Sequence, residues 1–504
     1  MNKLIVPFLT SLFLLCGCTH RPSLPESYTS ESSLPIITPD YTQVTIPPNI
    51  APLNFMMSEA EECVAEFSWT GGKLTFGRSN KIVIPEKEWK QMVEAAKGDS
   101  IRIVVYSKSK ERWTRHQAFA IHVAEEEIDP YISYRLISPS YIGYEGLTIN
   151  QRHLSSFEEK VVYSNELIQT EEKGQCINCH AYQNYRTDNM QFHMRQAHGG
   201  TMIVKDGTPQ KVNLSSKEII SAGVYPAWHP TRKLIAYSTN LTGQSFHTKL
   251  ADKIEVQDTE SDLILYDVES NEVSLISAEA NELETYPCWS PDGQTLYYAS
   301  AHMVFSDTIP RDYEAALRYE EFKYDLYSRS FNPDTRTFGP PQLVYSASEQ
   351  GKSATLPRVS PDGQYLLFAM GKWGCFHIWH PDADLYLTDL KNGETRLPEN
   401  INSPQAESYH SWSGNGRWIL FSSRRDDGNY TRLYFAYFDQ QGKTHKAFEL
   451  PQKDPEFYLR YLRSYNIPEF MLEPVRTTPH EFAAAAKKKG VPAKFVSTSK
   501  ASSR

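Results

Sequence analysis

Short stretches of alternating apolar and polar residues dominate the second half of the chain and recur with one layout. Each stretch predicts a strand ending in an aromatic residue or valine, a tight turn, and a second strand, because alternation with a period of two is typical of half-buried β-strands. The turns contain Asp292 with Gly293 and Asp362 with Gly363, pairs that supply the positive φ of a tight hairpin. The copies are YPAWHPTRKLIAYSTN (225–240), YPCWSPDGQTLYYASA (286–301), LPRVSPDGQYLLFAMG (356–371) and YHSWSGNGRWILFSSR (409–424).

A further strand of similar composition follows each copy. These strands are expected within 262–277, 324–331, 383–398 and 431–443. Four strands per repeated unit indicate the blades of a β-propeller. We count four full blades, and the segment 199–214 has the pattern of the outer hairpin of another, so five or six blades are expected.

The Trp-Ser-Pro-Asp-Gly turn at 289–293 resembles the hallmark of TolB-type propeller repeats. The turns at 229–232 and 413–416 depart from this pattern. The resemblance implies a propeller over residues 201–470. It says little about chemistry, because propellers host binding, scaffolding and catalysis alike.

The chain before the propeller has a different sequence pattern, without the repeat. Residues 50–165 alternate short β-rich runs with turns, and only 87–98 has a helical pattern, so we expect a small β-sandwich. Residues 18–49 are rich in proline, serine and threonine, which predicts a tether. We expect the tail, 471–504, to be disordered at its end. The predicted fold class is therefore all-β.

The first residues, MNKLIVPFLTSLFLLCGC, contain a lysine, an apolar run from Leu4 to Leu15, and then a cysteine-glycine-cysteine sequence. The run is shorter than the roughly 20 residues of a membrane-spanning helix. The segment resembles the signal of a bacterial lipoprotein, which implies removal of residues 1–17 and a lipid on Cys18. No acidic cluster follows Cys18, which favours an anchor in the outer membrane of the cell envelope, facing the periplasm.

The composition excludes some partners. The formal net charge is -9, and no basic stripe runs through the body of the chain, so we expect no nucleic-acid partner. Hydrophobic residues make up 40%, enough for the cores of two or three domains. The sequence contains neither a G-x-S-x-G nucleophile elbow nor a P-loop.

The segment GQCINCHAYQN (174–184) places Cys176, Cys179 and His180 in a C-x-x-C-H motif. A covalent haem, a small disulfide and half of a zinc site compete as explanations. The motif has no second C-x-x-C partner for zinc, and the chain is expected to be exported, where c-type haem is attached. We therefore predict one haem c in the segment 166–200, with thioether bonds to both cysteines and His180 as proximal iron ligand.

A short helix is expected over 186–200, where it would supply the sixth ligand. His193 and Met190 are the first candidates, followed by Met194 and His198. In the alternative, the methionines pack against a neighbour, and the iron either has five ligands or takes its sixth from elsewhere in the chain. Because only about 30 residues separate the sandwich from the propeller, the haem is expected at their interface.

Two further groups carry ligand-like chemistry. Cys375, His377, His380 and Asp382 could bind a metal, but ordinary loop packing is the expectation, since 377 and 380 would point to opposite faces of a strand. The run Arg424, Arg425, Asp426 and Asp427 could face a propeller channel and bind an anion or a sugar. The expectation for this run is a hairpin with solvated charges.

The arrangement of lipoprotein signal, β-domain, single C-x-x-C-H and TolB-like repeats resembles a group of lipoproteins found in Bacteroidetes. The resemblance to this group assigns no activity. A covalent haem with axial candidates nearby favours a membrane-anchored electron carrier for a redox or envelope protein, with the propeller as docking platform and without enzymatic activity of its own. A redox enzyme acting through the haem is favoured if the iron has five ligands. In the alternative, the propeller is a binding module for an envelope protein or a glycan, and the haem is structural or sensory.

Overall fold

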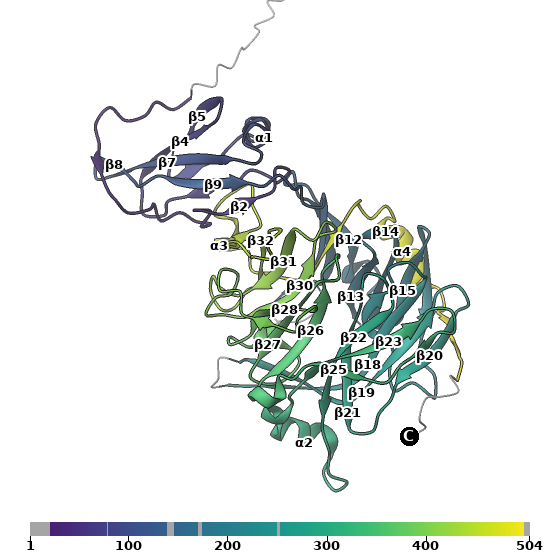
Figure 1. Cartoon of the computed structure of the whole chain (residues 1–504). Coiled ribbons are helices and arrows are strands. Elements are labelled where there is room, and N and C mark those ends of the chain that lie inside the picture. The colour runs from purple at the N-terminus through teal and green to yellow at the C-terminus, as the bar shows by residue number, and fades with distance from the viewer. Residues whose placement is uncertain (1–20, 78, 139–145, 170–173, 249–251, 498–504) are drawn as a thin grey trace, which may run out of the picture.

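The computed structural model describes residues 21–77, 79–138, 146–169, 174–248 and 252–497. Strands dominate this part of the chain, and they form an N-terminal domain and a large propeller (Figure 1). The all-β fold class predicted from the alternating pattern is confirmed. The signal segment and Cys18 lie outside the described residues.

The N-terminal domain is built on one seven-stranded sheet, in the order β1-β8-β7-β4-β5, with β9 beside β7 and β2 beside β9. A two-stranded ribbon of β3 and β6 and the helix α1 accompany this sheet. The second layer of the expected sandwich is thus a ribbon and a helix. The elements are β1 (Thr29–Ser30), β2 (Thr45–Ile46), β3 (Phe55–Met56), β4 (Glu62–Trp69), β5 (Gly72–Phe76), β6 (Lys81–Ile82), α1 (Glu86–Ala95), β7 (Ser100–Ser109), β8 (Arg112–Arg115) and β9 (Phe119–Val123).

The remaining long strands group into six antiparallel units, which we number blades 1 to 6. Blade 1 contains β34 (Ser464–Met471), β10 (Tyr131–Ile137), β11 (Thr148–His153) and β12 (Glu159–Ser164); blade 2 contains β13 (Gln175–Gln183), β14 (Arg186–Gln196), β15 (Gly200–Lys205) and β16 (Thr208–Asn213). Blade 3 contains β17 (Val224–Trp228), β18 (Leu234–Phe246), β19 (Ile254–Asp267) and β20 (Glu272–Ser277); blade 4 contains β21 (Glu282–Trp289), β22 (Thr295–His302), β23 (Asp325–Asn332), β24 (Thr337–Phe338) and β25 (Gln342–Tyr345). Blade 5 contains β26 (Ser353–Val359), β27 (Tyr365–Gly371), β28 (Asp384–Asp389) and β29 (Thr395–Arg396); blade 6 contains β30 (Glu407–Trp412), β31 (Trp418–Ser423), β32 (Arg432–Tyr437) and β33 (Phe448–Glu449).

The first strand named for each blade is its innermost one. These strands contact one another in the closed order β34, β13, β17, β21, β26, β30 and back to β34. The ring closes in blade 1, where β34 pairs antiparallel with β10 and places Tyr131 opposite Met471. Residues more than 300 positions apart in the sequence therefore share one sheet, which fastens the two ends of the propeller together.

The four repeats found in the sequence are confirmed as blades 3 to 6. The hairpin expected over 199–214 is β15 and β16 of blade 2. The N-terminal domain ends earlier than the expected range 50–165, because β10 to β12 lie within that range but belong to blade 1.

The helix predicted over 186–200 is wrong, since this segment contains strand β14. The run from Asn189 to Met194 is buried at every position. A strand covered on both faces loses the alternation that marks a half-exposed strand, and its apolar spacing then resembles a helix.

The predicted tether and tail are more ordered than the composition indicated. Ile37, Tyr41, Val44 and Ile46 are buried in the core of the N-terminal domain. Near the other end, α4 (Pro479–Lys487) begins with a capping box at Thr478 and Glu481. It is followed by β35 (Val491–Pro492), which pairs with β16, and β36 (Lys494–Phe495), which pairs with β20.

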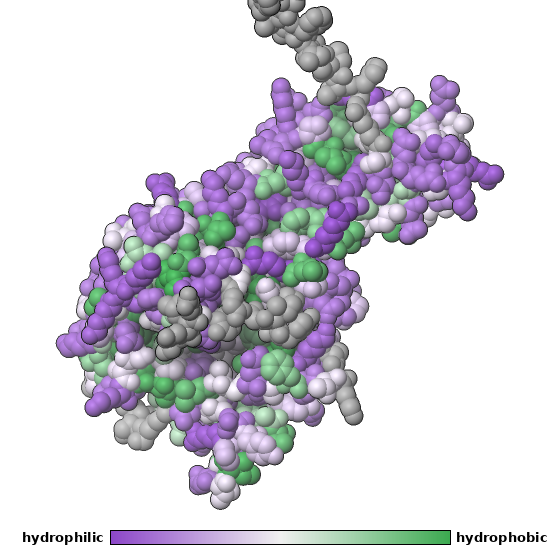
Figure 2. Space-filling model, turned by 180° about the vertical axis from the view of Figure 1, so that it is seen from behind, coloured by the Kyte–Doolittle hydropathy of each residue, from purple (hydrophilic) through white to green (hydrophobic). Residues whose placement is uncertain are grey.

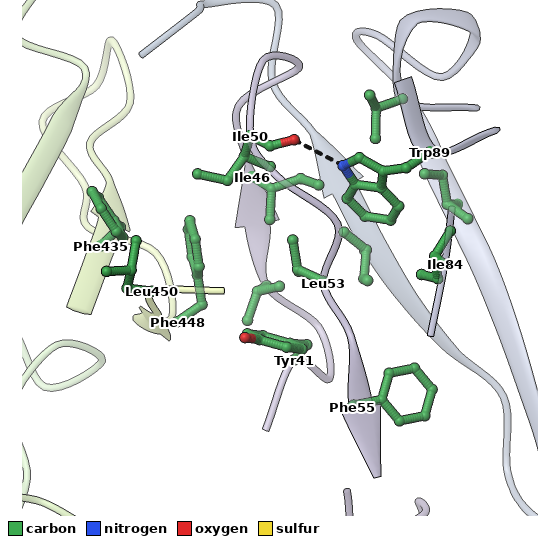
Figure 3. Close-up of a cluster of buried hydrophobic side chains, with 14 of the residues drawn as sticks. Tyr41, Ile46, Ile50, Leu53, Phe55, Ile84, Trp89, Phe435, Phe448 and Leu450 are labelled. Carbon is green, nitrogen blue, oxygen red and sulfur yellow. Dashed lines mark hydrogen bonds between the residues drawn. The ribbon is translucent and has the colours of Figure 1, made fainter. Parts of the chain in front are cut away.

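One hydrophobic cluster joins the N-terminal domain to blade 6 (Figure 3). Trp89 of α1 is fully buried and donates a hydrogen bond of 2.8 Å from Nε1 to the carbonyl oxygen of Ile50. Phe435, Phe448 and Leu450 extend the same cluster into the propeller. The two parts therefore share a core.

The remaining helices are α2 (Arg311–Leu317), in the connection between β22 and β23, and α3 (Phe457–Arg460), ahead of β34. Among the helices of the described residues, none is long and apolar enough to cross a membrane. Seen from behind, hydrophobic residues are scattered among hydrophilic ones over both parts of the molecule (Figure 2). Such scattered apolar residues are ordinary on a protein surface.

Closure of the ring predicts a large cost for truncating Phe470 on β34, which is 1% exposed within the shared cluster. We expect Phe470→Ala to lower the free energy of unfolding by about 3–5 kcal/mol, because it leaves a cavity in a packed core. Urea unfolding followed by tryptophan fluorescence measures this effect. Leu472→Ala, at a position 50% exposed, is the matched control and should change stability little. Equal losses in both variants would contradict the role given to β34.

Candidate functional site

A ring of β-bulges lines the central channel. Each innermost strand shows a register shift against its neighbour at the same place, and each has one residue there with positive φ. Bulges of this kind re-aim side chains and disrupt pairing locally. The positive-φ residues, which we call the bulge ring, are Cys179, Tyr225, Tyr286, Leu356, Tyr409 and Ile467.

The bulge ring corresponds to a short repeat in the sequence. Its copies are NCHAY (178–182), VYPAW (224–228), TYPCW (285–289), TLPRV (355–359), SYHSW (408–412) and NIPEF (466–470). The residue after the bulge is proline in four blades and histidine in blades 2 and 6. Cys179 and His180 are therefore the blade 2 version of a motif that all six blades share.

The three residues of the C-x-x-C-H motif lie on strand β13. Cys176 is half-buried, and its Sγ accepts a hydrogen bond of 3.2 Å from Nδ2 of Asn178. Cys179 is buried, and burial raises the pKa of its thiol. Both thiols are free.

His180 is 2% exposed and lies next to blade 1. Neither ring nitrogen makes a hydrogen bond of ordinary geometry to a described residue. Burial, helped by the nearby Arg135, lowers the pKa of His180 to about 3. The ring is therefore neutral at neutral pH. His410, at the same place in blade 6, also has a pKa lowered to about 3 by burial.

The candidate sixth ligands lie on β14 and in the turn after it. Met190 and Met194 belong to a hydrophobic cluster together with Phe192. His193 is opposite Asn178 in the strand register, and its Nδ1 lies 3.4 Å from Oγ1 of Thr201. His198 follows the strand in a turn. The structure gives the two methionines a packing role.

The surroundings of the motif do not fit a covalently attached haem. His180 borders a void of about 40 Å³, which has room for about three water molecules. The larger cavity nearby, of about 470 Å³, is lined by Cys179, but neither Cys176 nor His180 lines it. A c-type haem needs both thiols and the histidine around one macrocycle. Within the described part of the chain, the three residues do not line one common cavity that could hold it.

The larger cavity opens at the mouth of the channel where the innermost strands begin, and we call it the channel-mouth cavity. Side chains from blades 1, 2, 3 and 6 and from the loop before β28 line it. Four of these side chains are cationic, namely Arg135, Arg195, Lys253 and Arg424. No aspartate or glutamate is among its described lining residues, and none of the four cations forms an ion pair with a described carboxylate.

Two of the cations are buried. Arg135 is 6% exposed; it donates from Nη1 to the side-chain oxygen of Asn178, and its Nε has no partner within the described part of the chain. Arg424 is 4% exposed and donates from Nε to the carbonyl oxygen of Ile378 at 2.6 Å. Its guanidinium carbon lies 3.6 Å from the ring centre of Trp379. Burial lowers the pKa of Arg424 to about 9.

The opposite mouth of the channel has a different charge balance. It forms a cavity of about 550 Å³ whose lining includes both Arg358 and Glu469. These two side chains form an ion pair of 3.0 Å. The charges at this mouth are therefore compensated within the protein, in contrast to the channel-mouth cavity.

The charge run 424–427 differs from the solvated hairpin that was expected. Arg424 is buried in the cavity wall, and Arg425 pairs with the buried Glu407 at 3.1 Å. Asp426 accepts a hydrogen bond of 2.7 Å from the hydroxyl of Tyr434. Sequence reasoning missed Arg135, Arg195 and Lys253, because single cations on three separate blades leave no local pattern.

No protein-family model matches the chain, and no curated protein matches it. Among solved structures, an oligogalacturonate lyase in complex with manganese is 14% identical over 68% of this chain and 86% of its own, with a TM-score of 0.29. Prolyl oligopeptidase B from Galerina marginata is 8% identical over 69% of this chain and 42% of its own, with a TM-score of 0.36. The propeller architecture of this chain follows from its strand pairing and the closed contact of its innermost strands.

The buried state of His180 predicts a pH dependence of stability. An ordinary histidine has a pKa of 6.5, so the unfolded chain takes up a proton below this pH while folded His180 does not. Stability from this group is therefore present above pH 6.5 and is lost as the pH falls towards 3. Between pH 7.5 and 5.5 the loss amounts to about 1.4 kcal/mol.

His180→Pro should remove this share of the acid sensitivity and still fold, because four blades carry proline at the same place. Urea unfolding of both proteins at pH 7.5 and 5.5 measures the difference. His302→Asn, at an exposed histidine, is the control. If wild type and His180→Pro lost stability equally on acidification, the buried neutral state of His180 would be refuted.

Proposed function

We propose that the propeller is a binding module for a small anionic ligand, an acidic sugar of the cell envelope, held in the channel-mouth cavity. The observation that carries this proposal is the set of four cationic side chains in a cavity whose described lining contains no carboxylate. The cavity volume of about 470 Å³ lies within the range of small-molecule sites.

Charge explains why an anion is the expected ligand. A buried guanidinium without an anionic partner is costly, and the cost falls when a carboxylate or phosphate completes the pair. Arg135 and Arg424 are both buried in the cavity wall, and Nε of Arg135 has no hydrogen-bond partner among the described residues. Guanidinium groups bind carboxylates and phosphates with two parallel hydrogen bonds, which adds geometric selectivity.

Aromatic side chains explain why a ring-shaped ligand suits the site. The cavity wall includes rings from blades 3 and 6 and from the loop before β28. They are Tyr225, Phe246, Phe376, Trp379, Tyr409 and Tyr430. Flat apolar faces next to a few placed charges are typical of small-molecule pockets. A sugar offers one apolar ring face to such side chains and an acidic group to the arginines.

A lipid anchor would place this binding module in the envelope. With a lipid on Cys18, the mature chain would be held at a membrane surface, where envelope glycans are within reach. This part of the proposal depends on the signal sequence, which lies outside the described residues. Metabolic labelling with a fatty acid tests it, with Cys18→Ser as the unlabelled control.

The proposal predicts selective binding of acidic sugars. We expect glucuronate and glucose 6-phosphate to bind at least tenfold more tightly than glucose, because only the acidic sugars can pair with the buried arginines. Arg135→Gln should abolish this selectivity, and high salt should weaken it. Titration followed by ligand-observed NMR measures the three affinities.

Arg232→Gln is the matched control, since Arg232 is an exposed arginine paired with Asp334 away from the cavity. Equal affinity for the acidic and neutral sugars, or acidic-sugar binding that survives in Arg135→Gln, would overturn the assignment. Lys253 lies at the exposed rim of the cavity, so Lys253→Gln should not affect folding. We expect this variant to bind acidic sugars more weakly than the wild type.

The sequence predicts haem attachment, whereas the geometry of the motif argues against it, and a visible spectrum decides between the two. Because the motif residues do not surround one cavity, we expect protein produced with a cytochrome c maturation system to show no covalent haem. A sharp α-band in the reduced protein that is absent from Cys176→Ala/Cys179→Ala would show the opposite. In that case electron transfer becomes the favoured function.

A further inference from the structure

Three potential metal ligands meet at the edge of blades 3 and 5. Asp252 precedes β19, while His380 and Asp382 lie in the loop between β27 and β28. Each offers one ligand atom, and these atoms all lie within 4.8 Å of one another. More than 120 residues separate Asp252 from the other two, so the fold alone creates this cluster.

His380 is held in one orientation by an acidic partner. Its side chain is fully buried, and its Nε2 lies 3.2 Å from Oε2 of Glu255. Glu255 also accepts a hydrogen bond of 2.9 Å from Nε1 of Trp373. A carboxylate in this position makes Nε2 the protonated nitrogen of His380.

The other nitrogen of His380 is left without a partner. Nδ1 is buried and makes no hydrogen bond to any described residue. With Nε2 protonated, Nδ1 carries a free lone pair, which is the state in which histidine binds a metal ion. An unpartnered buried polar atom costs about 1–3 kcal/mol, and a bound cation would remove that cost.

The two carboxylates are also arranged for a ligand. Oδ2 of Asp382 accepts a hydrogen bond of 2.8 Å from the backbone N–H of Lys372, which fixes the orientation of that carboxylate. Oδ1 of Asp252 is buried without a hydrogen-bond partner among the described residues. Two carboxylates this close repel each other unless a cation lies between them.

A glycine next to His380 allows the backbone of the loop to pack closely against the imidazole ring. Gly374 has a φ of +74°, and a Cβ atom built on it would lie 3.3 Å from Cε1 of His380. A larger residue there would be strained and would press on the histidine ring. The loop is therefore shaped around His380 and Glu255.

We infer that Asp252, His380 and Asp382 form a binding site for a divalent transition-metal cation, with Glu255 as the outer partner of the histidine. One imidazole nitrogen with two carboxylate oxygens suits Zn²⁺ or Mn²⁺, and the hydrogen-bonded carboxylate behind the imidazole is the usual support of such a ligand. The loop packing expected from the sequence accounts for His377, whose Nδ1 lies 3.0 Å from Oγ1 of Thr355, but not for His380.

A cation here would link two loops that border the channel-mouth cavity. Lys253 follows Asp252 directly, and Phe376 and Trp379 belong to the same loop as His380; all three line the cavity. Metal binding would therefore fix one side of the cavity rim. The metal site stands on its own ligands, so it is tested separately from sugar binding.

Zinc binding to the full chain tests the inference. After treatment with EDTA, untagged protein is titrated with Zn²⁺ in a calorimeter, and thermal unfolding is recorded with and without the metal. We expect one tight site per chain and a rise in unfolding temperature, because a ligand that binds only the folded state stabilises it. Asp382→Asn and His380→Gln should weaken binding at least tenfold and lose the temperature rise.

Asp384→Asn is the matched control, since Asp384 lies two residues further along the chain and outside the cluster. It should bind Zn²⁺ as the wild type does. Undiminished binding in Asp382→Asn, or no binding by the wild type, would overturn the inference. Substitution with Co²⁺ separates this site from the free cysteines, because the three assigned ligands contain no sulfur and a thiolate-to-cobalt charge-transfer band would refute the assignment.

Discussion

The closed contact of six innermost strands is the constraint on which the rest of the propeller depends. Each of these strands carries a non-glycine residue with positive φ at its bulge, a conformation that costs about 1–3 kcal/mol when nothing compensates it. The cost is tolerated because the neighbouring strands hold each bulge from both sides. Pairing of β34 with β10 closes the ring. Each strained bulge is therefore held by strands of the two neighbouring blades.

This ring also gives the C-x-x-C-H motif its structural explanation. Cys179 takes the position that tyrosine, leucine or isoleucine takes in the other blades, and His180 takes the position of the bulge proline. His410 shows that a histidine can occupy this place as a buried, neutral side chain. The C-x-x-C-H sequence is typical of haem attachment, but in this fold it is also one copy of the repeat that forms the bulge ring.

The bulge ring divides the channel into two mouths with different electrostatics. At one mouth Arg358 and Glu469 neutralise each other, so this end has no excess charge to offer a ligand. At the other, buried guanidinium groups face a cavity whose described lining contains no carboxylate. The loops that carry Asp252 and His380 stand beside that second mouth, which places the proposed metal and the proposed ligand next to each other without shared residues.

The sequence by itself determined the local features of this protein. The alternation of apolar residues and the turns at Asp292 with Gly293 and Asp362 with Gly363 are encoded within a few residues, so four blades could be predicted. Strand β14 could not, because burial on both faces removed its period of two. The residues of the channel-mouth cavity and of the metal cluster could not be predicted either, because they come from separate blades.

Only the tertiary structure decided which distant residues meet. Arg135 and Arg424 face one cavity although almost 290 residues separate them, and Asp252 reaches His380 from another blade. No local pattern marks such pairs, because their distance depends on the number of blades and on the closure of the ring. Functional residues that lie close together on one strand can be recognised in the sequence. Sites whose residues come from different blades can be recognised only in the folded structure.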